Sequence, residues 1–318
     1  ALRSVNGFIF DDGKLTISAT GATEDDESKG IKVEGSETTG TGKGYIVING
    51  GYITVTSVGK AITAGWDIDE DATTTSTADD PDPYVIVNNG IITLTTTGTP
   101  YEKTTTGGTI SLSPEGIEAK SNLTINSGYL IIKTTDDALN AGGDITINGG
   151  YLYCASSNND GIDANGDLTI NGGYLVVLGA SSPEGSFDYD DDDSSTKNFF
   201  TIKGGTFVGI GGVTARPTTL TQNVVVLGSL TSGATLAIKS SAGATVFAFT
   251  IPQSYATMIL SSPDIVTGTR YTVYTGGSVS ASYVFNGLYL ESLSHSGGSA
   301  GSSFTVSSAL TYLGGIFF

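Results

Sequence analysis

The chain has 318 residues, with 45 glycines, eight prolines, one cysteine and a formal net charge of −18. A strongly acidic surface repels the phosphates of nucleic acids, so we expect no nucleic-acid partner. The single cysteine, Cys154, excludes a disulfide within the chain, and we expect its side chain to be buried. No apolar run reaches 18 residues, so no membrane span is predicted.

The charge is divided unevenly along the chain. Residues 1–193 hold 30 acidic and nine basic residues, a net charge of −21, whereas residues 194–318 hold two acidic and five basic ones, a net charge of +3. A difference of this size indicates two structural units. We predict a first domain over residues 1–212 and a second over residues 213–318.

The chain begins with a predicted pair of strands, Gly7–Phe10 and Lys14–Ser18, which are joined by a turn at Asp11–Gly13. Residues 30–33 and 45–55 then carry alternating apolar residues, and the second of these segments contains Asn-Gly-Gly-Tyr. The same pattern returns in clearer form later in the chain. These segments therefore predict the first coils of a repeating β structure.

The next predicted coil is interrupted. Its two halves are residues 60–64 and 84–94, and the Thr- and Asp-rich segment 66–82 lies between them. A second insertion covers residues 98–108. Insertions in a solenoid form loops, and these often lie on its functional face.

Residues 115–178 contain nearly the same phrase three times, and the repeats follow one another at steps of 22 and 23 residues. Such a period is typical of a solenoid, in which neighbouring repeats stack to bury one apolar side. Within each repeat the apolar residues alternate at strand period, and Asn-Gly turns separate the short runs. We predict an all-β fold, a right-handed parallel β-helix with coils about 4.8 Å apart.

The period is lost in the last third of the chain. A final weak coil is expected at residues 199–208, and from residue 215 onward short alternating segments are separated by Ser, Gly and Pro turns. We predict that this part is a small antiparallel β unit that caps the open edge of the solenoid.

Residues one period apart stack directly in a β-helix, so the alignment predicts columns of side chains. One column consists of asparagines at the same turn, and stacked amides hydrogen-bond along such a ladder. We interpret this column as structural. Its members are Asn49, Asn88, Asn126, Asn148 and Asn171.

Three further columns are acidic. They are Glu115, Asp137 and Asp160; Glu118, Asn140 and Asp163; and Asn122, Asp144 and Asp167. Like charges about 4.8 Å apart repel one another unless a cation neutralises them. Ca²⁺ binds six to eight oxygen ligands of this kind, whereas the alternative is that the acids lie outside in water.

We predict a calcium site, with ligands drawn from Asp136, Asp137, Asn140, Asn159, Asp160, Asp163 and Asp188. Two acidic runs, Asp190–Asp193 and Asp67–Asp71, are weaker candidates. The second run has the alternating acids of a calcium loop but lacks the glycine that an EF-hand requires at its sixth position.

A column of tyrosines is predicted to face outward, since its neighbours in the strands face inward. Aromatic rings at regular spacing suit the C–H faces of sugar rings. The predicted carbohydrate-binding residues are Tyr129, Tyr151, Tyr153 and Tyr174. The alternative is that a loop or the C-terminal unit covers this column.

No catalytic residue is predicted. His295 is the only histidine and is expected on an exposed loop, and the chain lacks both a His/Cys cluster for zinc and a Gly-x-Ser-x-Gly motif. A lyase would need a basic side chain beside the acidic columns. Lys120 and Lys133 are the only nearby candidates that the alignment offers, and we expect both to be ordinary surface lysines.

The phrase Asp-Ala-Leu-Asn-Ala-Gly-Gly-Asp-Ile-Thr-Ile-Asn-Gly-Gly-Tyr at residues 137–151, followed by its near copy at residues 159–174, resembles the bacterial carbohydrate-binding domain family of the clostridial cellulose- and pectin-binding type. The resemblance is clearest over residues 115–180. It implies a pectate-lyase-like β-helix, a secreted or cell-surface location, and binding of calcium and plant-type polysaccharide. It also implies that Asp137, Asn140, Asp160 and Asp163 are associated with calcium.

We therefore expect a non-catalytic, calcium-binding protein that binds a polysaccharide of the cellulose or pectin type. We expect it to be monomeric and to act at the bacterial cell surface or after secretion, with its signal or lipoprotein anchor removed. The alternatives are a calcium-dependent polysaccharide lyase, which would be an enzyme, and a structural cell-surface adhesin.

Overall fold

The computed structural model describes residues 1–21, 28–34, 44–65, 82–105, 108–190 and 197–318. These residues form 35 β-strands and no helix, so the described part contains no helix that could cross a membrane. The candidate calcium loop Asp67–Asp71 and residues 191–193 of the acidic run Asp190–Asp193 lie outside the described residues.

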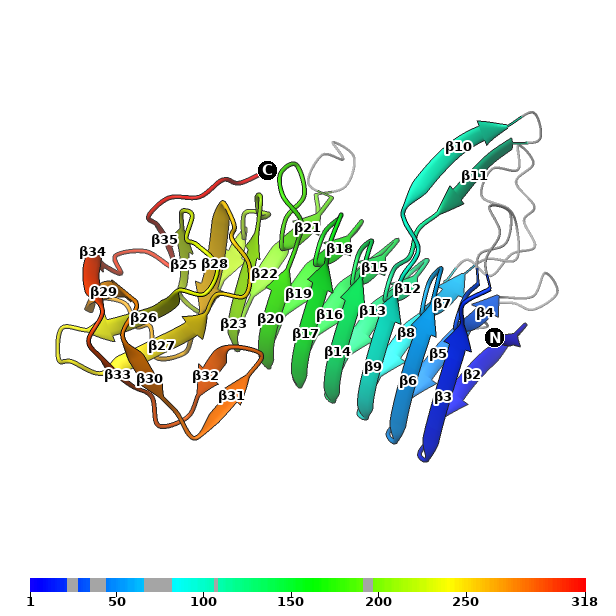
Figure 1. Ribbon diagram of the computed structural model, residues 1–318, viewed down its shortest axis with the longest axis horizontal. Coiled ribbons are helices and arrows are strands. Elements are labelled where there is room, and N and C mark those ends of the chain that lie inside the picture. The colour runs from blue at the N-terminus through cyan, green and yellow to red at the C-terminus, as the bar shows by residue number, and fades with distance from the viewer. Residues whose placement is uncertain (22–27, 35–43, 66–81, 106–107, 191–196) are drawn as a thin grey trace.

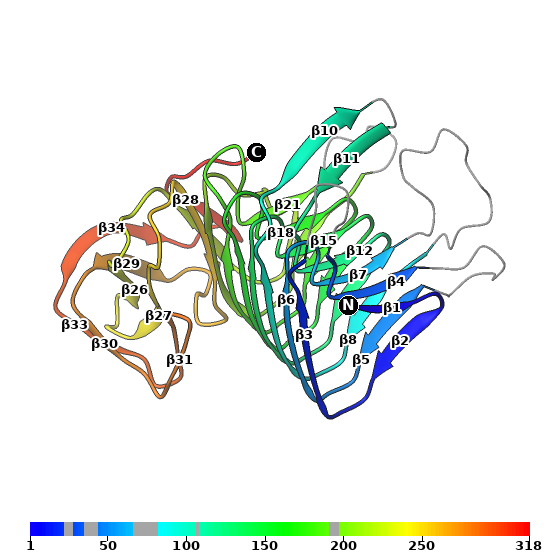
Figure 2. The same ribbon diagram turned by 45° about the vertical axis from the view of Figure 1, so that its right-hand side comes forward.

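Three long sheets run side by side along the molecule, and each coil of the chain contributes one strand to each sheet (Figures 1 and 2). Sheet A is parallel throughout, and its strands are β1 (Leu2–Ser4), β4 (Ile31–Glu34), β7 (Ile62–Gly65), β12 (Ile117–Ala119), β15 (Leu139–Ala141), β18 (Ile162–Ala164) and β21 (Phe187–Tyr189).

Sheet B is also parallel throughout. Its strands are β2 (Gly7–Phe10), β5 (Tyr45–Ile48), β8 (Val85–Val87), β13 (Leu123–Ile125), β16 (Ile145–Ile147), β19 (Leu168–Ile170), β22 (Phe200–Ile202) and β24 (Thr219–Leu220).

Sheet C begins with seven parallel strands, β3 (Lys14–Ala19), β6 (Tyr52–Ser57), β9 (Ile91–Thr96), β14 (Tyr129–Thr134), β17 (Tyr151–Ser156), β20 (Tyr174–Leu178) and β23 (Thr206–Gly211). It continues through β28 (Thr257–Ser261), which is antiparallel to β23, and then through β25 (Val224–Leu227) and β35 (Leu310–Tyr312). The predicted parallel β-solenoid is confirmed.

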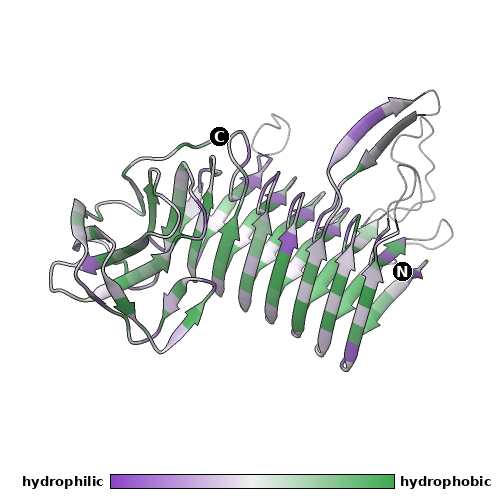
Figure 3. Ribbon diagram, in the orientation of Figure 1, coloured by the Kyte–Doolittle hydropathy of each residue, from purple (hydrophilic) through white to green (hydrophobic). Residues whose placement is uncertain are grey.

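The core of the solenoid follows the predicted columns. Leu130 pairs in register with Leu152, and Leu152 pairs with Leu175, and all three side chains are fully buried. Each buried aliphatic side chain of this size contributes about 1.5–3 kcal/mol. Cys154 lies in the same interior, as expected. Figure 3 shows the consequence as bands of opposite hydropathy that alternate along the strands.

The asparagine ladder is confirmed. Each Nδ2 donates to the Oδ1 of the asparagine one coil earlier at 2.7 Å, from Asn171 back to Asn49, whose Nδ2 donates to Asp11. A second ladder uses the third acidic column. The Oδ1 of Asn122 and that of Asp144 each accept the backbone N–H of the next residue in the column at 2.8 Å. That column therefore satisfies backbone donors and does not join a cluster of free carboxylates.

The C-terminal part contains a six-stranded antiparallel sheet, as predicted. Its strands, in spatial order, are β31 (Tyr283–Phe285), β32 (Leu288–Leu290), β27 (Thr245–Thr250), β26 (Thr235–Ser240), β29 (Arg270–Thr275) and β34 (Ser299–Thr305). Two two-stranded antiparallel sheets accompany the main sheets. One pairs β30 (Ser278–Ser280) with β33 (Ser294–Ser296). The other is the hairpin of β10 (Tyr101–Thr105) and β11 (Gly108–Leu112), which projects from the solenoid (Figure 1).

The C-terminal sheet packs against the outer face of the last strands of sheet C. Val176, Leu178, Val208 and Ile210 point away from the solenoid core and are buried in an apolar cluster that the C-terminal sheet completes. Sheet C itself extends beyond residue 212 through β28 and β25, so the two predicted units share one sheet. The boundary at residue 212 stays a prediction.

Candidate functional site

An open groove of about 720 Å³ runs along the turns that join sheet B to sheet C. Six successive coils line it: the first contributes Asp12, and each of the next five contributes turn residues and the first residue of its sheet C strand. Its lining residues are Asp12, Gly50, Gly51, Tyr52, Asn89, Gly90, Ile91, Ser127, Gly128, Tyr129, Gly149, Gly150, Tyr151, Gly173 and Tyr174. The groove therefore follows the solenoid axis and repeats at the coil step.

Glycine allows the turns that line this groove to stack closely. Gly128, Gly150 and Gly173 have φ values of 118°, 95° and 98°, a region that other residues rarely adopt. A Cβ atom on Gly150 would lie 2.8 Å from the carbonyl oxygen of Gly128 in the coil before it. The Asn-Gly-Gly pattern of the sequence is thus a requirement of the stacked turns.

The tyrosine column lines the groove for three coils. Tyr129 pairs with Tyr151 and Tyr151 with Tyr174, and the ring centroids are 5.9 Å and 4.8 Å apart. Tyr52, which is 55% exposed, and Ile91 extend the same column toward the N-terminus. Ile91 thus takes the place of the tyrosine in its coil.

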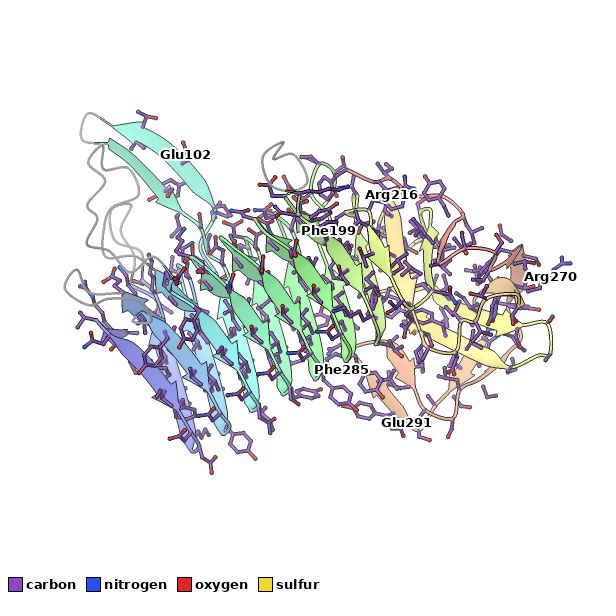
Figure 4. The ribbon with its side chains drawn as sticks, turned by 180° about the vertical axis from the view of Figure 1, so that it is seen from behind. Glu102, Phe199, Arg216, Arg270, Phe285 and Glu291 are labelled. Atoms are coloured by element: carbon purple, nitrogen blue, oxygen red, sulfur yellow. The ribbon has the colours of Figure 1, made fainter. Side chains whose placement is uncertain are left out.

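The C-terminal unit covers one side of the tyrosine column. The ring of Tyr129 makes an edge contact with Phe285, at 5.4 Å between centroids, and Tyr151 makes similar contacts with Phe285 and Tyr283. Figure 4 shows Phe285 beside the lower end of the coils. Burial, followed by the neighbouring Tyr283, raises the pKa of Tyr129. The tyrosine column is therefore partly covered by the C-terminal unit and partly open, since its rings are half-buried and still line the groove.

Tyr153 lies elsewhere. It belongs to the next outward column of sheet C, between Ile131 and Val176, and packs against the apolar cluster beneath the C-terminal sheet. It does not line the groove, whereas Tyr129, Tyr151 and Tyr174 do.

The predicted calcium ligands come together beyond the far ends of the sheet C strands and on the outward side of sheet A. We call this group the acidic cluster, and it consists of Glu115, Glu118, Asp136, Asp137, Asn140, Asn159, Asp160, Asp163 and Asp188. The backbone pairing stacks Glu118, Asn140, Asp163 and Asp188 in one column.

Hydrogen bonds connect the members of the acidic cluster. The Nδ2 of Asn159 donates to Asp136 at 2.7 Å, and the Nδ2 of Asn140 donates to Glu115 at 3.0 Å. The backbone N–H of Asp160 donates to the Oδ1 of Asp137 at 2.9 Å. Asp136, Asp137 and Asp160 are 7%, 3% and 5% exposed, so these acids do not lie outside in water.

Burial makes ionisation of this cluster unfavourable. Desolvation, followed by the neighbouring Glu118, raises the pKa of Glu115 from 4.5 to about 8. Desolvation likewise raises the pKa of Asp160 from 3.8 to about 8, and that of Asp163 to about 7, with Asp188 adding to both. The pKa of Asp137 is raised well above its ordinary value by burial and then by Asp163.

Lysines neutralise one end of the acidic cluster. The Nζ of Lys60 lies 2.7 Å from Glu115 and 3.1 Å from Glu118, and the Nζ of Lys120 lies 2.8 Å from Glu118. Although burial opposes it, these two ammonium groups lower the pKa of Glu118 to about 2. The expectation that Lys120 is an ordinary surface lysine was wrong, because it pairs with a buried carboxylate.

Lys60 was missed at the sequence level. It is 7% exposed and stacks on Glu115, because the backbone N–H of the following residue bonds to the Glu115 carbonyl. The match between Lys-Ala-Ile-Thr-Ala at residues 60–64 and Glu-Gly-Ile-Glu-Ala at residues 115–119 carried this signal. If the long insertion is treated as a loop within one coil, the alignment places Lys60 in the same column as Glu115, Asp137 and Asp160.

His295 is also placed differently from expectation. It lies in β33 rather than in an exposed loop, and it is buried, with its Nε2 2.9 Å from the carbonyl oxygen of Gly276. Its ring packs beside Tyr274, at 5.5 Å between centroids. It is paired with Val279 of β30, and it lies in neither the groove nor the acidic cluster.

The acidic cluster fits a hard cation by its donor type and charge. Carboxylates and asparagine oxygens are the ligands that Ca²⁺ prefers, and five Asp side chains of the acidic cluster are buried or half-buried. No group of three or more His, Cys, Asp or Glu side chains in the described residues is already arranged as a metal site. Charge, rather than preset coordination geometry, is therefore the basis for considering a cation.

Comparison with known proteins adds one finding. A family model described as carbohydrate-binding domain-containing protein matches residues 1–161, which include most of the groove and all of the acidic cluster except Asp163 and Asp188. No curated protein and no solved structure matches the chain. Because the match covers just over half of the 318 residues, the chain belongs to the family of carbohydrate-binding domain-containing proteins.

Proposed function

We propose that the chain is a non-catalytic module that binds a linear polysaccharide of the cellulose type along the groove between sheets B and C. The observation that carries this proposal is the row of groove-lining tyrosines repeated at the coil step, in a chain of a carbohydrate-binding family. We further propose that the module acts as a monomer, outside the cell or at the bacterial cell surface.

The groove offers both kinds of contact that a sugar chain needs. Tyrosine rings present faces to the C–H sides of sugar rings, and their hydroxyls present polar tips. Asp12, Asn89 and Ser127 add polar side chains along the glycine turns. Because coils repeat about every 4.8 Å, an extended polymer that lies along the axis meets a similar surface at each coil.

The groove and the acidic cluster lie at opposite ends of the sheet C strands. Tyr129 begins β14 and lines the groove, whereas Asp136 follows the end of the same strand. Six residues of strand at about 3.3 Å each separate the two places by roughly 20 Å. A cation at the acidic cluster would therefore not touch a polymer that lies in the groove.

We propose that calcium, held by Asp136, Asp137, Asp160, Asp163 and Asp188 with Asn140 and Asn159 beside them, stabilises the solenoid. The ion would supply positive charge to Asp137, Asp160 and Asp163, whose pKa values are raised by burial. A polymer of the pectin type, which carries carboxylates of its own, would instead meet the ion on the sheet A side. Binding of a pectin-type polymer at the ion should therefore depend on calcium, whereas binding of a cellulose-type polymer in the groove should not.

The test is affinity electrophoresis of the intact chain and of Tyr52→Ala in gels that contain hydroxyethylcellulose or polygalacturonate. Loss of one sugar-stacking ring should weaken binding about fivefold, for roughly 1 kcal/mol. Tyr312→Ala is the matched control, because Tyr312 is 54% exposed and lies outside the groove. Equal retardation of both variants would refute the groove as the binding site.

The same samples test the two alternatives. A lyase would use a basic residue beside the cation, and Lys60 and Lys120 lie there, although both are paired with carboxylates. Incubation with polygalacturonate and calcium should yield no unsaturated product that absorbs in the ultraviolet. Formation of such a product would refute the non-catalytic function and favour a lyase. Absence of retardation by either polymer would favour the adhesin.

A further inference from the structure

A second hollow, of about 680 Å³, lies where the last coils of the solenoid meet the C-terminal unit. Ser156, Ser157, residues 179–182 and Gly211–Gly212 line it from the ends of three sheet C strands. Ser229 and residues 253–256 line it from the C-terminal unit. Both parts of the chain therefore build it, and it is separate from the groove.

The lining is polar but uncharged. None of the described residues that line it is Asp, Glu, Lys, Arg or His, and six are serines. Ser156 and Ser254 already accept backbone N–H groups at 2.9 Å and 3.1 Å. The other four, Ser157, Ser181, Ser182 and Ser229, are exposed, and the described residues offer their hydroxyls no hydrogen-bond partner.

Part of the surface is apolar. Ala180 and Ala256 are half-buried and Tyr255 is buried, and all three line the hollow beside the serines. A ligand that matches this lining presents hydroxyls on one side and C–H groups on another. An ionised ligand would meet no opposite charge there, so its desolvation would not be offset.

The walls of the hollow are held in place by hydrogen bonds between the two units. The Nε2 of Gln253 donates to the carbonyl of Gly179 at 3.1 Å, and the backbone N–H of Ala256 donates to that of Gly211 at 3.0 Å. Gly212 packs so closely that a Cβ would lie 1.7 Å from the backbone nitrogen of Ser182. A hollow with fixed walls loses little entropy when a ligand enters it.

We propose that this hollow is a second binding site, which takes a short uncharged sugar such as a disaccharide or the end of a glycan chain. It lies within the range of about 300–1,000 Å³ that small-molecule sites occupy. The choice of a sugar among uncharged polyols rests on the proposed carbohydrate-binding function. The groove would hold the interior of a polymer, and the C-terminal unit would add the site for short chains.

The test uses the whole chain and three variants, with cellobiose as the neutral probe and galacturonate as the charged one. Ser181→Trp fills the hollow from an exposed loop, Ser241→Trp places the same ring on an exposed hairpin turn, and Tyr52→Ala alters only the groove. Cellobiose binding is measured by isothermal titration calorimetry, and polymer binding by gel retardation. Circular dichroism melts confirm that each variant is folded.

Ser181→Trp should weaken cellobiose binding by about tenfold or more, whereas Ser241→Trp and Tyr52→Ala should leave it unchanged, and galacturonate should not compete. Cellobiose binding that survives Ser181→Trp, or that Tyr52→Ala abolishes, would overturn the second site. So would the absence of cellobiose binding in a chain that still binds polymer. If the unmodified chain binds cellobiose but no polymer, the groove is refuted instead, so the two failures are distinguishable.

Discussion

Raising the pH in the absence of calcium should destabilise this protein, because buried carboxyls in the acidic cluster hold protons that the unfolded chain would release. The pKa values of Glu115 and Asp160 are raised to about 8 and that of Asp163 to about 7, from ordinary values of 4.5 and 3.8. A group whose folded pKa lies above its unfolded pKa stabilises the folded state at low pH. This stabilisation is lost as the pH rises through that window.

The size of the effect follows from the number of carboxyls. Each one that is protonated in the folded chain and ionised in the unfolded chain removes at most about 1.4 kcal/mol per pH unit. Three of them give an upper limit of about 4 kcal/mol per unit between about pH 5 and about pH 7. For 318 residues each kcal/mol shifts Tm by about 1.5 °C, so Tm should fall by up to about 6 °C per unit.

Glu118 has the opposite sign but acts outside this window. Its pKa is lowered to about 2 by Lys60 and Lys120, so its contribution is present above its unfolded pKa of 4.5 and is lost only as the pH falls toward 2. The change in stability between about pH 5 and about pH 8 therefore reports on the carboxyls whose pKa is raised, and not on Glu118.

The assay is a series of thermal melts followed by circular dichroism, at four pH values from about pH 5 to about pH 8, in chelated buffer and in millimolar calcium. Calcium binds the ionised cluster and should reduce the fall in Tm, most strongly at the highest pH. Asp160→Asn should flatten the profile in chelated buffer, whereas Asp264→Asn, at an exposed position, should not. A Tm that stays level or rises with pH in chelated buffer would refute the reasoning. A Tm at the highest pH that is the same with and without calcium would refute the ion site.

Three substitutions test the remaining structural claims by urea denaturation. Lys60→Met should cost about 3–5 kcal/mol, because it removes the ammonium group beside buried Glu115 and leaves Glu118 with Lys120 alone, and a change within error would mean that the ion pair contributes nothing. Gly150→Ala should cost at least about 1 kcal/mol, because Gly150 has a positive φ and lies close to the carbonyl oxygen of Gly128. Gly149→Ala should cost less, since the φ of Gly149 is not positive. Equal losses would contradict the claim that the stacked turns require glycine at position 150. Asn148→Ala removes two ladder hydrogen bonds and should cost about 1–2 kcal/mol. The control Thr146→Ala should cost about a few tenths of a kcal/mol. Similar costs for both variants would show that the ladder does not stabilise the fold.

The repeat of the sequence determined most of the solenoid. Strand alternation and a step of 22 or 23 residues were enough to predict the parallel stacking, the inward position of Cys154 and the asparagine ladder. The reason is physical, because a solenoid repeats one local structure and places residues one period apart in direct contact. Where the period is clean, aligning the sequence amounts to aligning the coils.

The same logic brought Asp136, Asp137, Asp160 and Asp163 together as predicted, but it failed where insertions hide the period. Lys60 precedes Glu115 by 55 residues, because insertions lengthen the coil between them, and yet the two side chains pair across adjacent coils. The burial that raises the pKa values of Asp137, Asp160 and Asp163 also depends on how the folded coils pack rather than on any residue pattern.

Only the tertiary structure decided how the tyrosine column is presented. Alternation alone predicts that Tyr129, Tyr151 and Tyr153 all face outward, and they do. Whether an outward ring meets solvent depends on what packs there, and Phe285 arrives from a strand more than 130 residues later in the chain. Contacts between parts with no shared period leave no trace in a repeat alignment, so the groove, its covered side and the second hollow appear only when the chain is folded.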